Sequence, residues 1–308
     1  MALVTRTWRW LRADPRHGQI ATLATLLTYG LIWLDFDLPL AQAALTIASA
    51  LVAPAIGDRW RGAPLVGGAK SALISALSLC LLLRTDVPLL AVVGAAVAVG
   101  SKFFIRCRGK HVFNPTNVAL VALLLTTDHV WVSPGQWGTQ AAFAFFIACA
   151  GLLVVTRAAR ADVTAAFITA YAGLLVARSL WLGEPLTIPA HRLESGAFLL
   201  FSFFMISDPK TTPDSRVGRV LFAWLVALGA AYVHFRLFRP NGFLWALVAL
   251  SPLVPVIDLL LPAARYRWPS AVEPLTSAST RRVPISPSPS TSPSPSPSPL
   301  VPSMEVPR

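Results

Sequence analysis

Two polar segments interrupt a chain that is otherwise rich in apolar residues, and both could bind a charged or polar ligand. The first reads R-G-K-H-V-F-N-P-T-N over residues 108–117. Lysine and histidine side chains supply hydrogen-bond donors here, beside a helix start whose free N–H groups attract anions. A phosphate or the carbonyl of an isoalloxazine ring suits such a site. The residues expected to form it are Lys110, His111, Asn114, Thr116 and Asn117.

Pro115 sets the local backbone in this first segment. It cannot donate a backbone hydrogen bond and it disfavours helix at the preceding Asn114, so the chain should be extended before the next helix begins. The amide and hydroxyl groups can then bind a ligand or satisfy freed backbone groups. In the alternative interpretation, Asn114 and Thr116 only cap the helix, while Arg108 and Lys110 anchor the loop at the membrane surface.

The second segment reads S-D-P-K-T-T-P-D-S-R over residues 207–216, directly after an aromatic run. A carboxylate at the edge of such a run is costly unless it is paired, so we expect Asp208 to pair with Lys210 or Arg216. Asp208 and Lys210 would order this second half of the site. Asp214 or Ser215 should cap the helix that follows. In the alternative interpretation, the segment is only a loop of turn residues.

The elements that must position these segments are membrane-length apolar blocks. Of 308 residues, 55% are hydrophobic and 13% are charged, whereas soluble domains carry about 25% charge. The pattern predicts an all-α, polytopic membrane protein of about ten transmembrane helices. The first block lacks a cleavage site and should be retained. The blocks lie at about 19–36, 38–56, 68–84, 87–105, 114–130, 138–156, 163–182, 191–207, 217–237 and 241–261.

The basic residues indicate the orientation. Their net charge of +12 does not form a nucleic-acid patch, because they lie in the short loops between apolar blocks. With a cytoplasmic N-terminus, 21 Lys and Arg fall on the cytoplasmic side and 5 on the other. Such an excess favours a multi-pass protein of the cell membrane with both termini in the cytoplasm. We therefore expect the lipid bilayer as partner and no nucleic acid.

Two pairs of matching segments indicate an internal repeat. F-N-P-T-N at 113–117 resembles F-R-P-N-G at 238–242, and R-T-D at 84–86 resembles I-S-D at 206–208. The first pair is separated by five predicted helices, an odd number, so its two copies enter the membrane from opposite faces. The sequence thus predicts a cytoplasmic segment at 1–18, five-helix repeats at 19–137 and 138–262, and a disordered Ser/Pro-rich cytoplasmic tail at 269–308.

Few other polar groups lie within the apolar blocks. Ser71, Ser75 and Ser78 recur at helical spacing, which is typical of a helix-packing face or a polar lining. Asp258 is interpreted as an interfacial residue near Arg265. The three cysteines have no metal-ligand spacing, and the sequence has no Walker loop, hydrolase elbow, zinc motif or dinucleotide fingerprint.

The two polar segments carry a family resemblance. G-K-H-V-F-N-P and F-M-I-S-D-P are similar to the motifs of the membrane subunits Nqr B and Rnf D, which belong to the sodium-pumping NADH:quinone oxidoreductase and the Rnf electron-transport complex. The matching positions are Gly109, Lys110, His111, Phe113, Asn114, Pro115, Phe204, Met205, Asp208 and Pro209. The similarity covers roughly residues 12–262. It implies ten helices in a 5+5 inverted repeat, similar to urea transporters.

One family feature is missing. The resemblance implies a flavin attached to threonine in an S-G-A-T type motif, yet none occurs here, and Gly138-Thr139 and Thr164 are poor substitutes. Any FMN or riboflavin is therefore expected to bind non-covalently. The chain most resembles shortened stand-alone members, including the unbU-type proteins found with enediyne biosynthesis genes.

Three functions follow as hypotheses. The first is a membrane electron-transport subunit, flavin-binding and coupled to ion transport, with other redox subunits as partners. The second is a small-solute or ion transporter that uses the same scaffold without redox chemistry. The third is a non-catalytic membrane partner of an enediyne-type biosynthetic pathway, which would dock through its basic loops.

Overall fold

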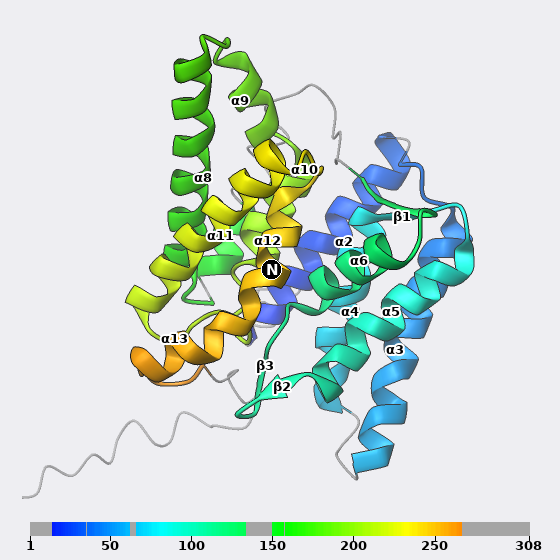
Figure 1. Ribbon diagram of the computed structural model, residues 1–308. Coiled ribbons are helices and arrows are strands. Elements are labelled where there is room, and N and C mark those ends of the chain that lie inside the picture. The colour runs from blue at the N-terminus through cyan, green and yellow to red at the C-terminus, as the bar shows by residue number, and fades with distance from the viewer. Residues whose placement is uncertain (1–13, 35, 62–65, 134–149, 157, 267–308) are drawn as a thin grey trace, which may run out of the picture. The chain divides into compact units, whose positions relative to one another are not determined.

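In the described part of the first half of the chain there are five helices (Figure 1). They are α2 (Pro15–Trp33), α3 (Leu40–Arg61), α4 (Val66–Leu82), α5 (Pro88–Phe104) and α6 (Pro115–Thr126). Three of them start with proline, which is tolerated there because the first helical N–H has no intrahelical partner. The computed structural model describes residues 14–34, 36–61, 66–133, 150–156 and 158–266.

The described part of the second half also contains both long and short helices. Residues 150–156 are helical. They are followed by α8 (Ala161–Leu182), α9 (Thr187–Leu193), α10 (Gly196–Leu200), α11 (Arg216–Arg236), α12 (Gly242–Leu250) and α13 (Val254–Leu260). A 3₁₀ turn, η2 (Ser251–Leu253), joins α12 to α13, so the last apolar block is one interrupted helix.

A π-helical turn, η1 (Phe201–Met205), continues α10. Its geometry is visible in the hydrogen bond from Ile206 N–H to the carbonyl of Phe201, five residues back. Side chains from other helices use its carbonyls. The Thr164 hydroxyl donates to Ser202 O at 2.9 Å, and the Asn114 amide donates to Met205 O at 3.3 Å. These donors stabilise a turn that is otherwise rare.

The helices agree with the predicted class of an all-α membrane protein. Every predicted apolar block contains helix where the structure describes it, although residues 138–149 of the sixth block lie outside that part. Within the described residues, three helices are long and apolar enough to cross a bilayer: α8, α11 and the continuous run 242–260. Five others are apolar but shorter. The count of ten spans and the inverted repeat therefore stay predictions, and the tail expected to be disordered lies outside the described residues.

Two short antiparallel sheets add to the helices. β1 (Leu83–Thr85) pairs with β4 (Val130–Val132), with Arg84 opposite Trp131. The predicted helix at 114–130 was therefore wrong at its end, because α6 stops at Thr126 and Thr127 is already extended. After the end of α6 the backbone N–H and C=O groups have no helical hydrogen-bond partners. Pairing of β4 with β1, the strand that follows α4, supplies these partners.

The second sheet is a tight hairpin between α5 and α6. β2 (Arg106–Cys107) pairs with β3 (Lys110–His111), and only Arg108 and Gly109 connect them. Both connecting residues have positive φ, 53° and 77°. This is the backbone of the two-residue turns that match strand twist, and glycine adopts it without steric cost. The hairpin fixes the position of the first polar segment.

Helix packing follows the same order in the two halves. In the first, α5 packs against α3 and α6; in the second, α11 packs against α8 and α12. Stacked and tilted aromatic rings fill the second half, among them Phe167, Phe198, Phe201 and Phe243. The halves meet where α6 contacts α12, near the centre of Figure 1. That junction lies beside both polar segments.

Candidate functional site

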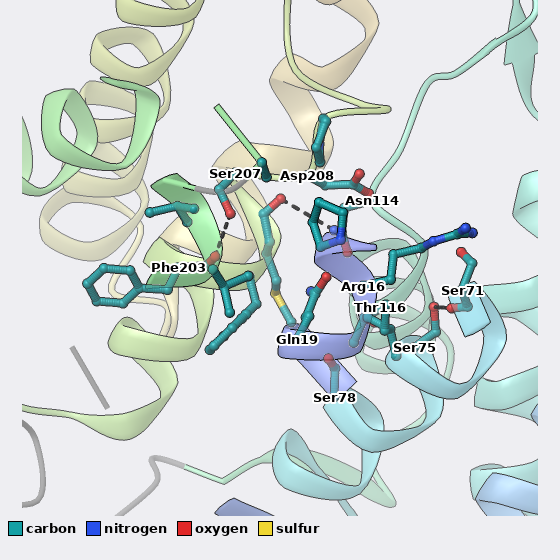
Figure 2. A pocket seen from close by; sticks show the side chains of 18 of the residues that line it. Arg16, Gln19, Ser71, Ser75, Ser78, Asn114, Thr116, Phe203, Ser207 and Asp208 are labelled. Carbon is teal, nitrogen blue, oxygen red and sulfur yellow. Dashed lines mark hydrogen bonds between the residues drawn. The ribbon is translucent and has the colours of Figure 1, made fainter. Parts of the chain in front are cut away.

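A small polar cavity lies where α2, α4, the start of α6, the helix at 150–156 and η1 converge. Its volume is about 60 Å³. Figure 2 shows hydroxyl, amide and carboxylate groups from several elements turned toward this space. We call it the serine cavity. Its polar lining residues are Arg16, Gln19, Ser71, Ser75, Ser78, Asn114, Thr116, Ser207 and Asp208.

Asn114 joins the first polar segment to the second. It has extended backbone and caps α6, where its Oδ1 accepts the Asn117 N–H at 3.1 Å. Its Nδ2 donates to Met205 O at 3.3 Å, across 91 residues of sequence. The predicted capping by Asn114 and the predicted extended entry to the helix are therefore confirmed, whereas Lys110, the surface anchor of the same interpretation, is only 9% exposed and ion-paired. Because Met205 lies two residues before Ser207, one amide positions both segments.

Asp208 lies at the edge of the serine cavity and is paired differently from the prediction. Its Oδ1 accepts the backbone N–H of Lys210 at 3.0 Å, and no Lys or Arg of the described chain lies within ion-pair distance of it. The expected ion pair with Lys210 or Arg216 was wrong, since the Lys210 ammonium donates to Tyr266 O and Arg216 is exposed. Burial raises the pKa of Asp208.

Asn117 faces the other half of the chain rather than the serine cavity. Its Nδ2 donates to Leu244 O in α12 at 3.1 Å. Its Oδ1 is buried and has no hydrogen-bond partner among the described residues. Asn117 therefore joins the two helices whose entrances carry the matching segments, and Thr116, one residue earlier, lines the cavity.

Lys110 and His111 lie in a second pocket of about 210 Å³, which we call the hairpin pocket. The Lys110 ammonium lies 3.0 Å from Asp214 Oδ1 and 2.8 Å from Asp258 Oδ2. Asp258 also accepts the Asp214 N–H at 2.7 Å. The interpretation of Asp258 as an interfacial residue near Arg265 was therefore incomplete: Arg265 lines this pocket, but Lys110 is the direct partner.

His111 is held neutral. Burial lowers its pKa to about 4, and the nearby positive charges of Arg106, Lys102 and Lys210 act in the same direction. Its Nδ1 is buried without a partner in the described part of the chain. An uncharged imidazole can accept or donate one hydrogen bond at each nitrogen, but it adds no charge for an anion.

The seven predicted site residues therefore divide into four places. Asn114, Thr116 and Asp208 share the serine cavity, and Lys110 and His111 share the hairpin pocket. Asn117 lies at the α6–α12 contact, and Lys210 is turned toward Tyr266. Ser215, one of the two predicted caps, accepts the Gly218 N–H at the start of α11.

The described residues do not form a ready flavin site. Pockets for drug-sized ligands are roughly 300–1,000 Å³, and both cavities are smaller. The lysine expected at a phosphate is neutralised by two carboxylates, Asp214 and Asp258. In the serine cavity, Arg16 is bonded to Asp14 at 2.7 Å, and Asp208 would repel an anion. The serine cavity suits water or a small polar species instead.

Part of the chain is similar to a known protein family. Residues 126–267 match the model of the NQR2, RnfD, RnfE family, a stretch that contains the second polar segment. This part of the chain is therefore similar to that family. The predicted resemblance to Rnf D and Nqr B is thereby confirmed, while the hairpin segment at 108–117 lies before the matched residues.

Similar curated proteins are named as the D component of an ion-translocating oxidoreductase complex. The protein from Stutzerimonas stutzeri is 35% identical over 94 residues, which is 30% of this chain and 26% of that protein. That from Erwinia tasmaniensis is 30% identical over 106 residues, 34% and 30% of the two chains. One from Escherichia coli is 31% identical over 130 residues, 42% and 32%. The match thus spans about a quarter to a third of each relative.

Sequence reasoning missed several buried charges. Lys102 in α5 donates to the serine face of α4. Asp162 and Arg219 form an ion pair at 2.5 Å between α8 and α11. Arg160 donates to Thr212 at 3.2 Å. Lys102 and Arg219 gave a signal, because ionisable residues inside apolar blocks mark sites or partners. Arg160 and Asp162 lie between two predicted blocks and gave none.

Proposed function

We propose that the chain is an integral membrane subunit of an ion-translocating electron-transport complex, similar to Rnf D. The match of residues 126–267 to the NQR2, RnfD, RnfE family carries this proposal, and the names of the curated relatives supply the reaction class. The polar junction of Asn114, Met205 and Asp208 supports it, because intramembrane polar residues at helix interruptions are typical of ion pathways. Other redox subunits would be its partners in the inner membrane.

The proposed architecture is ten spans in a 5+5 inverted repeat with both termini in the cytoplasm. Three features support it. The order of packing α3–α5–α6 matches that of α8–α11–α12. The offset near 125 residues relates α4 to α10 and η1, which precede the matching segments at 84–86 and 206–208. Finally, α6 and α12 meet each other close to their own starts, through Asn117 and Leu244.

In the electron-transport proposal, a non-covalent FMN or riboflavin binds only where other subunits complete the site. The hairpin pocket carries His111 and the partly exposed turn before it, but Lys110 is already paired. The chain would thus contribute one wall of a flavin site at a subunit contact.

The test is an absorbance and fluorescence spectrum of the detergent-purified protein before and after acid denaturation. Flavin released by acid, in the isolated chain or in a complex with co-expressed partner subunits, supports the electron-transport proposal. Flavin that stays with the polypeptide would indicate an unrecognised attachment residue. A colourless protein in both preparations, with flavin supplied during expression, would refute a flavin-carrying role.

A second candidate is a transporter for a small solute or ion without redox chemistry. The observation that favours it is the serine cavity, which is too small for a flavin and is lined by hydroxyl and amide groups. Uptake into proteoliposomes by the isolated chain tests this candidate. Saturable uptake that Asn114→Ala removes would support it, and the absence of uptake of every ion and small solute tried would exclude it.

A further inference from the structure

We propose that the serine face of α4 forms a binding site for a monovalent cation, and that in this chain the ammonium group of Lys102 fills it. Two serine hydroxyls and one backbone carbonyl, from Ser71 and Ser75, supply the oxygens. Lys102 is thus a tethered internal cation. The proposal is independent of flavin and electron transport, because it concerns only these three residues and the cavity beside them.

The geometry around Lys102 is that of a filled cation site. Its Nζ donates to Ser71 O at 2.9 Å, to Ser71 Oγ at 3.0 Å and to Ser75 Oγ at 3.0 Å. An ammonium group has three donors, and all three are used. A single hydrogen bond would be enough to join α4 to α5. Three neutral oxygens at nearly equal distance instead surround a positive charge, as oxygens do when they replace the hydration shell of an ion.

The serine hydroxyls are arranged to present lone pairs to this charge. Ser75 Oγ donates its own hydrogen to Ser71 O at 3.1 Å, so its oxygen is free to accept from the ammonium. Figure 2 shows this bond and places both side chains at the rim of the serine cavity. Ser75 is only 4% exposed. Ser71 and Lys102 are partly exposed.

Burial opposes the positive charge of Lys102, and the negative charge of Asp208 partly offsets this effect from farther away. Among the described residues no carboxylate lies within ion-pair distance of Lys102. Lys102 also lies in the last turn of α5, where the helix dipole favours positive charge. Removing the lysine leaves the oxygens, the helix end and Asp208 in place, with one positive charge missing.

The substitution Lys102→Met tests the proposal, because methionine keeps an unbranched apolar stem but has no charge. Thermal unfolding of the purified protein is measured in NaCl, in KCl and in N-methyl-D-glucamine chloride at equal ionic strength. The wild-type midpoint should change by less than about 1 °C between these salts. The K102M midpoint should rise by about 3 °C or more in NaCl or KCl, because a ligand stabilises the folded state that binds it.

A matched control separates a site from a structural link. In K102M/S75A one of the three oxygens is removed, and the gain in NaCl or KCl should fall by at least half. A purely structural lysine predicts that K102M is destabilised equally in all three salts, which would overturn the proposal. An equal sodium or potassium effect in the wild type would also overturn it. Should K102M fail to fold in N-methyl-D-glucamine chloride, the proposal requires folding in NaCl or KCl, and failure in all three refutes it.

Discussion

Replacing Lys110 by methionine should destabilise the protein more than most single substitutions do. The ammonium lies between Asp214 and Asp258, at 3.0 and 2.8 Å. The side chains are 9%, 8% and 18% exposed, respectively, so water replaces little of the lost interaction. Methionine preserves the apolar stem, and the substitution therefore removes chiefly the positive charge.

The size of the destabilisation depends on the two carboxylates that remain when the lysine charge is removed. Removing one member of a buried ion pair costs about 3–5 kcal/mol, because the other charge is left uncompensated. Asp258 keeps the Asp214 N–H as a donor at 2.7 Å and is the more exposed of the two acids. We therefore expect the lower end, about 3 kcal/mol, which corresponds to a decrease of roughly 6–12 °C in the thermal midpoint.

The assay is thermal unfolding followed by tryptophan fluorescence in detergent, with a rescue variant as control. K110M/D214N removes one of the two carboxylate charges and should recover at least half of the loss. Lys110→Arg keeps the charge and should lose less than K110M. A K110M midpoint within about 2 °C of the wild type would refute the reasoning, as would a double variant no more stable than K110M.

Three further predictions concern other contacts. Asn114→Ala removes the α6 cap and the hydrogen bond to Met205 O, so it should lower the free energy of unfolding by about 2 kcal/mol. It should also abolish activity or flavin retention while the protein still inserts into the membrane. Wild-type stability and activity of this variant would contradict the prediction. Gly242→Ala places a Cβ 2.5 Å from the backbone oxygen of Ala230 and should cost about 1–3 kcal/mol in thermal unfolding, whereas an unchanged midpoint would show that α12 can shift. Burial raises the pKa of Asp14, but hydrogen bonds from Arg16 and Lys70 outweigh this effect and hold the pKa at about 2 against an ordinary 3.8, so the contribution of Asp14 to stability should be complete above about pH 5 and be lost as the pH falls through 4 toward 2. Asp14→Asn should remove that acid dependence, and an identical profile for both proteins would count against the assignment.

The helices could be predicted from the sequence because each depends on local information. Apolar runs of membrane length gave their positions, and Pro115 gave the start of α6. The start of α2 at Pro15 lies four residues before the predicted block at 19–36. The short strands could not be predicted this way. A three-residue run such as Leu83–Thr85 has no periodicity, and its partner at Val130–Val132 lies outside any local window.

The candidate site was predictable in its residue types but not in its pairings. The capping by Asn114 follows from the proline after it, so local rules suffice. The partners of Lys110 lie 104 and 148 residues away, and nothing in their spacing indicates them. The nearest acid in sequence to Lys210, Asp208, uses a backbone N–H instead. Lys102 was overlooked because it lies near the end of an apolar block and was counted only among the basic residues of the cytoplasmic side.

The π-helical turn at Phe201–Met205 sets the rotation about the helix axis at which the chain passes from α10 into the Ser207–Asp208 turn. An α-helix advances 1.5 Å and rotates 100° per residue, so a turn with one additional residue offsets everything after it by that step. Two side-chain donors, on Thr164 and Asn114, maintain the offset. If both donors are removed, the turn can relax to α geometry, and Asp208 would rotate relative to the serine cavity. Two hydrogen bonds from distant helices therefore determine which side chain the second polar segment presents to the first.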